Sequence, residues 1–185
     1  MTQRSDMDLL KAFLGGDNES FDLIVQRYST SVYRLAYKFT RNRANAEDVA
    51  QDTFLRCYEY LKRNPKEVNL KPWLMTICVN LCRNLAKKKK NFNFSDLKKE
   101  EDETHWEDRI EAKDKSPADK ARQKNEAERV NEAIEALPEK YQIVIQLRYA
   151  DDLSYQEIAD VLDLPLNTVK VHLTRAKEKL KAELS

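Results

Sequence analysis

The stretch SYQEIADVLDLPLNTVKVHLTRAKEKL, residues 154–180, determines the fold of the C-terminal part of the chain. Ser154 and Glu157 have capping-box spacing, in which each side chain satisfies a backbone amide of the first helical turn. A helix therefore begins at Ser154 and is expected to end at Asp163–Leu164, because Pro165 suits the first turn of a following helix. Two short helices joined in this way predict a helix-turn-helix unit.

The second helix of this unit has an apolar stripe and a polar face. On a helical wheel the apolar side carries Val169, Leu173, Ala176 and Leu180. The face directed away carries Asn167, Lys170, Val171, Thr174 and Arg175, with Thr168 in the same segment and His172 at the flank, where it is expected to approach a phosphate. Such a face suits base edges in the major groove, where each good bidentate contact discriminates by about 1–3 kcal/mol. A solvated helix in a protein–protein bundle is the alternative interpretation.

The composition predicts an all-α protein. Only 2 Gly and 5 Pro occur in 185 residues, which leaves little material for hairpin turns, and 35% of the residues are charged. No stretch approaches the roughly 20 apolar residues of a membrane helix, and the N-terminus lacks a long apolar segment. We therefore expect no membrane insertion and a cytoplasmic location.

The cysteines are expected to be buried thiols. Cys57, Cys78 and Cys82 all fall in apolar helical patterns, where Cys behaves as a small hydrophobic residue. Neither His105 nor His172 has a metal-ligand spacing to them. We predict no metal site and no cofactor.

Apolar periodicity divides the chain into two small helical domains. Residues 6–90 predict a four-helix bundle, residues 91–117 an acidic flexible linker, and residues 118–185 the helix-turn-helix domain. Charge is segregated accordingly: residues 83–90 hold five bases and no acid, residues 96–114 nine acids and four bases, and residues 164–182 five bases and one acid. Two basic modules on one tether suggest a DNA-binding protein.

The segment ANAEDVAQDTFLRCYEYL, residues 44–61, predicts a helix with two unlike faces. One side holds the core stripe Val49, Ala50, Thr53, Phe54, Cys57 and Leu61. The other holds Asp48, Gln51, Asp52, Leu55 and Glu59, an acidic and amide surface around one large aliphatic side chain. This is typical of a partner surface, although a single exposed Leu is also common on ordinary surfaces.

The next helix, predicted from Trp73 to about Lys89, also has a polar stripe. Its apolar face holds Leu74, Ile77, Cys78, Leu81 and Leu85, and its donor-rich face holds Thr76, Asn80, Arg83 and Lys87. The preceding loop, Arg63 to Lys71, contributes Val68, Asn69 and Leu70 as its candidate pocket residues.

Two quoted segments carry a family resemblance. LPEKYQIVIQLRYADDLSYQEIADVLDLPLNTVKVHLTRAKEKL, residues 137–180, resembles region four of the extracytoplasmic-function (ECF) sigma factors, and residues 44–61 resemble region two of that family. The resemblance extends from Asp8 to Leu180 and keeps the family order of the modules. It implies a bacterial sigma factor of the sigma-seventy class, which binds core RNA polymerase and directs promoter recognition, DNA opening and transcription initiation.

The resemblance also implies roles for the two faces and the tether. Asp48, Gln51, Asp52 and Leu55 become contacts for the clamp helices of the polymerase beta-prime subunit, and the beta flap is a second polymerase contact. Val68, Asn69, Leu70, Thr76, Asn80, Arg83 and Lys87 become minus-ten contacts, and Asn167, Thr168, Lys170, Val171, His172, Thr174 and Arg175 become minus-thirty-five contacts. The linker is expected to thread the polymerase RNA channel. An inhibitory anti-sigma factor is an implied partner, which no single residue identifies.

Two other classes of protein remain as alternatives. A helix-turn-helix transcriptional regulator that is not a polymerase subunit would explain the C-terminal half alone. An enzyme such as a small nuclease needs clustered carboxylates or a His-based site, and the acids here lie on an amphipathic face or in the linker. We predict no catalytic residues and no enzymatic activity.

Overall fold

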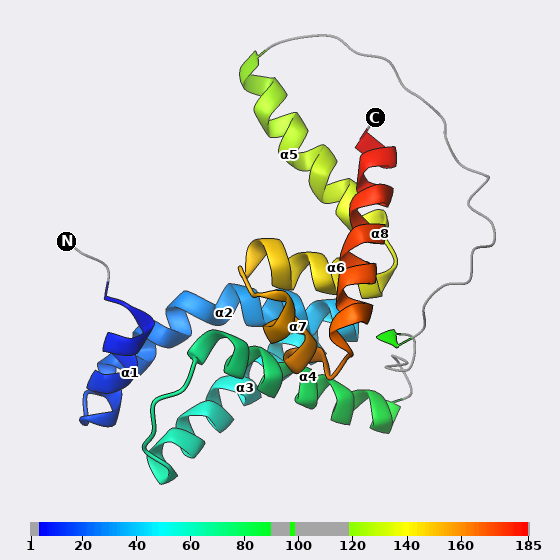
Figure 1. The fold of residues 1–185 in the computed structure, drawn as a ribbon. Coiled ribbons are helices and arrows are strands. Elements are labelled where there is room, and N and C mark those ends of the chain that lie inside the picture. The colour runs from blue at the N-terminus through cyan, green and yellow to red at the C-terminus, as the bar shows by residue number, and fades with distance from the viewer. Residues whose placement is uncertain (1–3, 90–96, 99–118, 185) are drawn as a thin grey trace.

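The structure, a computed structural model, describes residues 4–89, 97–98 and 119–184. Within these ranges every regular element is helical, as predicted, and the N-terminal module contains four helices (Figure 1). These are α1 (Asp6–Leu14), α2 (Glu19–Thr40), α3 (Arg43–Arg63) and α4 (Leu70–Lys89). The structure therefore agrees with an all-α fold that begins with a four-helix bundle.

Local signals fix where these helices begin and end. The Ser5 side chain caps α1 in a capping box with Asp8, and the chain leaves α1 through Gly15 and Gly16. Gly16 has a φ of 105°, in the left-handed region that favours glycine. Asn42 begins α3 by accepting a hydrogen bond from the amide of Asn45 at 2.9 Å.

The start of α4 differs from the prediction. The helix begins at Leu70 rather than Trp73, because Pro72 is accommodated in its first turn, where a missing N–H costs nothing. Leu70 is only 2% exposed and belongs to the core. The prediction that Leu70 is a pocket residue is therefore wrong, since its side chain is packed inside the bundle.

The C-terminal module contains the remaining helices. They are α5 (Asp119–Ala136), α6 (Glu139–Ile145), the π-helical turn η2 (Gln146–Ala150), α7 (Tyr155–Leu162) and α8 (Leu166–Leu184). Helices α5, α6 and α7 all pack on α8. The described side chains thus form a small bundle around the helix-turn-helix unit.

The two modules pack against each other. Helix α7 lies on α4, and α6 lies on α2, so that the apolar cores of the modules form one continuous cluster (Figure 1). Of the predicted linker, the structure describes Leu97, which is 1% exposed, and Lys98, which lies 4.0 Å from the Asp163 carboxylate. The rest of residues 91–117 lies outside the described residues.

Candidate nucleic-acid interface

The helix-turn-helix forms as its sequence predicts. Oγ of Ser154 accepts a hydrogen bond from the Glu157 amide at 3.2 Å, and the Glu157 carboxylate accepts one from the Ser154 amide at 2.8 Å. The hydrogen bond that the carboxylate accepts from the Ser154 backbone, followed by one with the Ser154 side chain, holds the pKa of Glu157 below its ordinary value. Asp163 then ends α7 in the left-handed conformation, with a φ of 49°. Three residues, 163–165, therefore connect α7 to α8.

Helix α8 presents part of the predicted DNA face to solvent. Asn167, Lys170 and Thr174 are exposed, and Val171 and Arg175 are half-buried on the same side. The core stripe consists of Val169, Leu173 and Ala176, which are at most 1% exposed. The wheel therefore predicted the exposed centre of this face correctly.

Two predicted contacts do not lie on this face. Thr168 is 7% exposed and His172 is 0% exposed. His172 packs edge-on against the ring of Tyr141 in α6, with the centroids 5.7 Å apart. Both α5 and α6 pack on α8. The buried side of α8 is therefore wider than the predicted stripe of Val169, Leu173, Ala176 and Leu180. The structure corrects the placement of His172 at an exposed flank.

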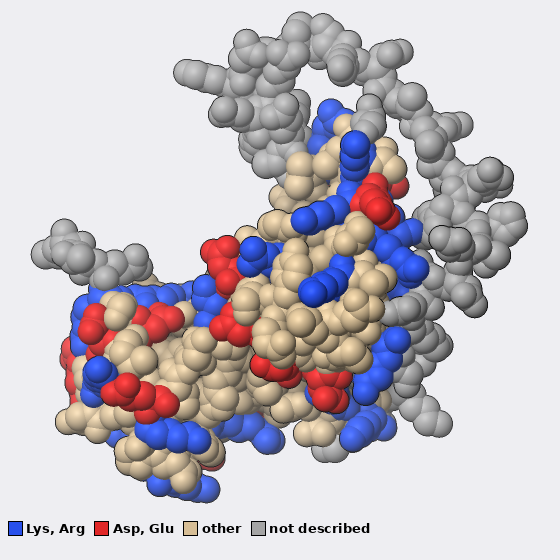
Figure 2. Space-filling view, viewed as in Figure 1, with Lys and Arg blue, Asp and Glu red and all other residues tan. Residues whose placement is uncertain are grey.

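Basic side chains dominate the surface of α8 within the helix-turn-helix (Figure 2). Lys170, Arg175, Lys177, Lys179 and Lys181 lie along the helix, with Glu178 and Glu183 as its acids. Lys177 also lies over the ring of Tyr149, 5.8 Å from its centroid. Such a surface can neutralise phosphates, which makes any DNA affinity dependent on salt.

A second polar face lies on α3. Asp48, Gln51, Asp52, Leu55 and Glu59 are all exposed. Leu55 is 55% exposed, which exceeds every other large hydrophobic side chain among the described residues. On the opposite side of α3, Thr53, Phe54 and Cys57 are buried. The sequence pattern thus separated the two faces of α3 correctly.

The polar stripe of α4 is divided by the C-terminal module. Asn80 and Lys87 are exposed, as is Asn69 in the preceding loop, and Val68 is half-buried. The Thr76 hydroxyl donates to the carbonyl of Pro72 at 2.9 Å. Arg83 reaches α7, where it donates to a backbone carbonyl. The structure brings these residues to one side of α4 but leaves only some of them open to a ligand.

The sequence did not predict a groove of about 230 Å³ between α3 and α4. It is lined by Arg56, Tyr60, Trp73, Ile77, Asn80, Leu81 and Asn84. The rings of Tyr60 and Trp73 lie 5.3 Å apart, and Asn80 joins this groove to the stripe. Aromatic rings and amides suit an unstacked base, whose stacking is worth about 1–3 kcal/mol. The four-residue spacing of Arg56 and Tyr60, which places both on one side of α3, was the sequence signal that could have indicated this groove.

The cysteines are buried in the core of the N-terminal module, as predicted. All three are free thiols, and burial raises the pKa of Cys57 to about 12. Among the residues that the structure describes, no three His, Cys, Asp or Glu side chains cluster closely enough to hold a metal ion. In the same residues no helix has the length and hydropathy needed to cross a bilayer.

Comparison with known families assigns both modules. Residues 24–92 match the model for Sigma-70 region 2, and residues 127–180 match the model for Sigma-70, region 4. The ECF RNA polymerase sigma factor SigW of Bacillus subtilis is 32% identical over 176 residues, which cover 95% of this chain and 94% of SigW. The RNA polymerase sigma-H factor of Pseudomonas aeruginosa is 31% identical over 182 residues, which cover 97% of this chain and 94% of that factor.

A solved structure supports the fold. The sigma factor RpoE of Bartonella quintana, crystallised with the anti-sigma factor NepR, superposes with a TM-score of 0.59 at 22% identity, covering 90% of this chain and 97% of that chain. Fold and modules together define a two-module promoter-recognition protein of the sigma-70 class. Within that class, the chain belongs to the ECF RNA polymerase sigma factors.

Proposed function

We propose that this chain binds core RNA polymerase and directs it to promoters, where the N-terminal module helps to open the duplex. The observation that carries the proposal is that both family modules occur in order on one chain, in a match to curated sigma factors that extends over 95% of its length. The polymerase supplies the nucleotide chemistry, so the chain itself acts by binding. The proposed binding to polymerase and promoter therefore takes place in the cytoplasm, where polymerase and chromosome are found.

In this proposal α8 binds the minus-thirty-five element in the major groove. The contacts are Asn167, Lys170, Val171, Thr174 and Arg175, the predicted residues that α8 leaves at least partly open. Arg and Lys donate to guanine, Asn and Thr bind polar base edges, and Val contacts a thymine methyl group. The buried Thr168 and His172 support this face from behind.

The minus-ten element is assigned to α4 and the loop before it. Asn69, Asn80 and Lys87 are exposed, and Arg83 can reach DNA once it leaves α7. Val68 and Thr76 are half-buried beside them. Extracting a base costs a few kcal/mol of stacking, and the adjacent groove with Tyr60 and Trp73 can offset this cost.

Helix α3 is assigned to core polymerase. Asp48, Gln51 and Asp52 surround the exposed Leu55, which gives an apolar anchor within a charged rim. We propose the beta-prime clamp helices as the partner of this face and the beta flap as the partner of the C-terminal module. An anti-sigma factor, as in the complex of RpoE with NepR, is the proposed inhibitor.

The test is run-off transcription with purified bacterial core polymerase and fragments that include the region upstream of the chain's own gene. We expect discrete transcripts that require the protein and are lost when Lys170 and Arg175 are both changed to Ala. The matched control is Lys11→Ala with Arg4→Ala, two exposed bases at the opposite end of the molecule.

A helix-turn-helix regulator that is not a polymerase subunit is the competing proposal. It leaves the Sigma-70 region 2 match over residues 24–92 without a role. DNA binding without any binding to core polymerase or effect on start sites would favour the regulator and overturn the sigma proposal.

A further inference from the structure

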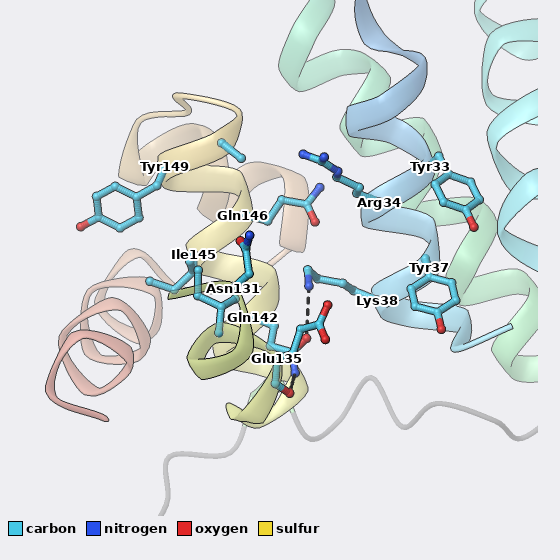
Figure 3. Close-up of a pocket in the computed structure, with 12 residues that line it drawn as sticks. Tyr33, Arg34, Tyr37, Lys38, Asn131, Glu135, Gln142, Ile145, Gln146 and Tyr149 are labelled. Carbon is cyan, nitrogen blue, oxygen red and sulfur yellow. Dashed lines mark hydrogen bonds between the residues drawn. The ribbon is translucent and has the colours of Figure 1, made fainter. Parts of the chain in front are cut away.

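A cavity of about 510 Å³ lies between α2 on one side and α5, α6 and η2 on the other (Figure 3). Its volume falls in the range of about 300–1,000 Å³ that is usual for small-molecule sites. The exposed side chains of Tyr37 and Tyr149 belong to its lining, so the cavity is open to solvent. None of the DNA or polymerase contacts proposed above lines it. The cavity is therefore a separate feature of the surface.

Two cations of α2 line the cavity without a carboxylate partner. Figure 3 shows the side chains of Arg34 and Lys38 extending from α2 toward α6 and η2. Lys38 donates to Oε1 of Gln142, a neutral acceptor, at 3.2 Å, and neither cation forms an ion pair with a carboxylate that the structure describes. Burial lowers the pKa of Lys38, and the charges of Arg41 and Arg34 act in the same direction. A bound anion would offset this cost.

The charges around the cavity favour a ligand with a single negative charge. Besides Arg34 and Lys38, the charged residue of its described lining is Glu135 of α5. Arg41 lies near Lys38, but its charge is balanced by Glu139, whose Oε1 lies 2.9 Å from Nε of Arg41. Two cations and one carboxylate leave one positive charge, so a second negative charge on a ligand would face Glu135 without compensation. This favours a carboxylate over a phosphate dianion.

The remaining lining indicates the body of the ligand. Ile134 and Ile145 line the cavity together with tyrosine rings, which suits a flat aromatic group. Gln146 is 6% exposed, and its Nε2 donates to the carbonyl of Ser31 at 3.1 Å. Its Oε1 is buried and accepts no hydrogen bond from the residues that the structure describes.

The Gln146 amide can therefore use a further donor. Figure 3 shows it directed from η2 toward α2, beside Arg34. Because a buried acceptor without a donor is unfavourable, a hydroxyl group on the ligand would satisfy it. The cavity thus offers cations for an acid, apolar groups for a ring and an acceptor for a hydroxyl.

We infer that this cavity binds a small hydroxylated aromatic carboxylate. The ligand carboxylate meets Lys38 and Arg34, the ring lies against Ile134 and Ile145, and the hydroxyl donates to Oε1 of Gln146. The site stands independently of the proposed function, because it shares no residue with the proposed DNA and polymerase faces.

The test titrates the isotope-labelled full chain with para-hydroxybenzoate and follows the backbone amide resonances by NMR. We expect saturable shifts centred on residues 34–38 of α2 and 142–146 of α6 and η2, with a dissociation constant of about 1 mM or tighter. Three analogues each change one feature: para-hydroxybenzamide lacks the charge, benzoate lacks the hydroxyl, and phenyl phosphate is largely a dianion at neutral pH. Each should bind at least about fivefold more weakly.

Substitutions in the cavity separate the effect of charge from an effect on folding. Lys38→Gln and Arg34→Gln should each weaken the binding of para-hydroxybenzoate at least about fivefold. Glu135→Gln should strengthen it about threefold, because the variant removes the opposing charge. A gain in affinity cannot arise from a damaged fold. The matched control is Lys11→Gln on α1, outside the cavity, which should leave the affinity unchanged.

Three results would overturn the site. The first is the absence of saturable shifts up to about 10 mM para-hydroxybenzoate, or shifts centred on the basic surface of α8, which would indicate general anion binding. The second is equal affinity for para-hydroxybenzoate and para-hydroxybenzamide, because the cations would then select no anion. The third is equal affinity for benzoate and para-hydroxybenzoate, which would leave Gln146 without a role.

Discussion

Leu55 is the side chain on which the polymerase proposal can be tested most directly. Its 55% exposure lies within the acidic face of α3, so Leu55→Asp should leave the fold unchanged. We expect at least about 30-fold weaker binding to core polymerase, which corresponds to the roughly 2 kcal/mol of a central interface residue. The measurement is fluorescence anisotropy of the labelled protein titrated with core polymerase.

The control for this substitution is Leu23→Asp on α2, where the leucine is 43% exposed. It changes a comparable side chain outside the proposed interface, and its affinity should stay within about twofold of the wild type, as expected for a surface position away from such features. Equal losses in both variants would mean that Leu55 has no specific role.

The reactivity of the three thiols is a second property that depends on single residues. Cys57, Cys78 and Cys82 are at most 2% exposed. Burial raises the pKa of Cys57, and the adjacent Cys82 together with burial raises that of Cys78. Because the thiolate is the reactive form, native protein should be inert to a thiol reagent at pH 8. We expect three equivalents of Ellman's reagent to react only after unfolding in denaturant; rapid reaction of native protein would contradict this.

Among the elements, α7 depends most clearly on a local signal. Its capping box satisfies two backbone amides, so Ser154→Ala should lower the free energy of unfolding by about 1 kcal/mol. Ser154→Thr should retain most of that stability. The measurement is denaturant unfolding followed by circular dichroism. Ser5→Ala in α1, which removes the other complete capping box described, provides the comparison.

How far the elements could be predicted from sequence depends on the origin of each signal. The start of α7 and the two faces of α3 follow from spacing within one helix, and both were predicted. The burial of His172 depends on Tyr141 in another helix, which a wheel drawn for α8 alone does not include. Leu70 was misplaced because Pro72 was taken as the end of a loop instead of part of a first turn.

At the scale of the whole molecule, the contact between the modules was left open by the sequence. Apolar periodicity marks which side of a helix is buried, but not which distant helix covers it. The hydrogen bond from Arg83 to the Leu162 carbonyl joins residues 79 positions apart, and no local sequence pattern predicts it. The groove between α3 and α4 likewise depends on a tertiary pairing of Tyr60 with Trp73.

Asp151 makes the stability of the joined molecule depend on pH. It is 2% exposed after η2, and burial raises its pKa although hydrogen bonds from Ser31 and Gln146 act in the opposite direction. The folded state therefore holds the proton more tightly than the unfolded state. Stability is present at low pH and is lost as pH rises from the ordinary value of 3.8 through the raised pKa.

Asp151→Asn removes the cost of burying the charge. We expect the melting temperature at pH 7 to rise by about 2–4 °C, the change that about 1 kcal/mol gives in a chain of this size. The difference should shrink as the pH falls through the raised pKa of Asp151 toward the ordinary value of 3.8, because the wild-type carboxyl becomes protonated. Differential scanning fluorimetry across pH measures it, and a difference that does not vary with pH would contradict a titration of Asp151.

The hydrogen bond between Arg83 and the Leu162 carbonyl has a further consequence for any ligand of α4. The carbonyl is tethered to its donor by the chain itself, and a tethered group competes at an effective concentration of about millimolar order. A ligand that binds through the Arg83 guanidinium must therefore displace a partner that is always present.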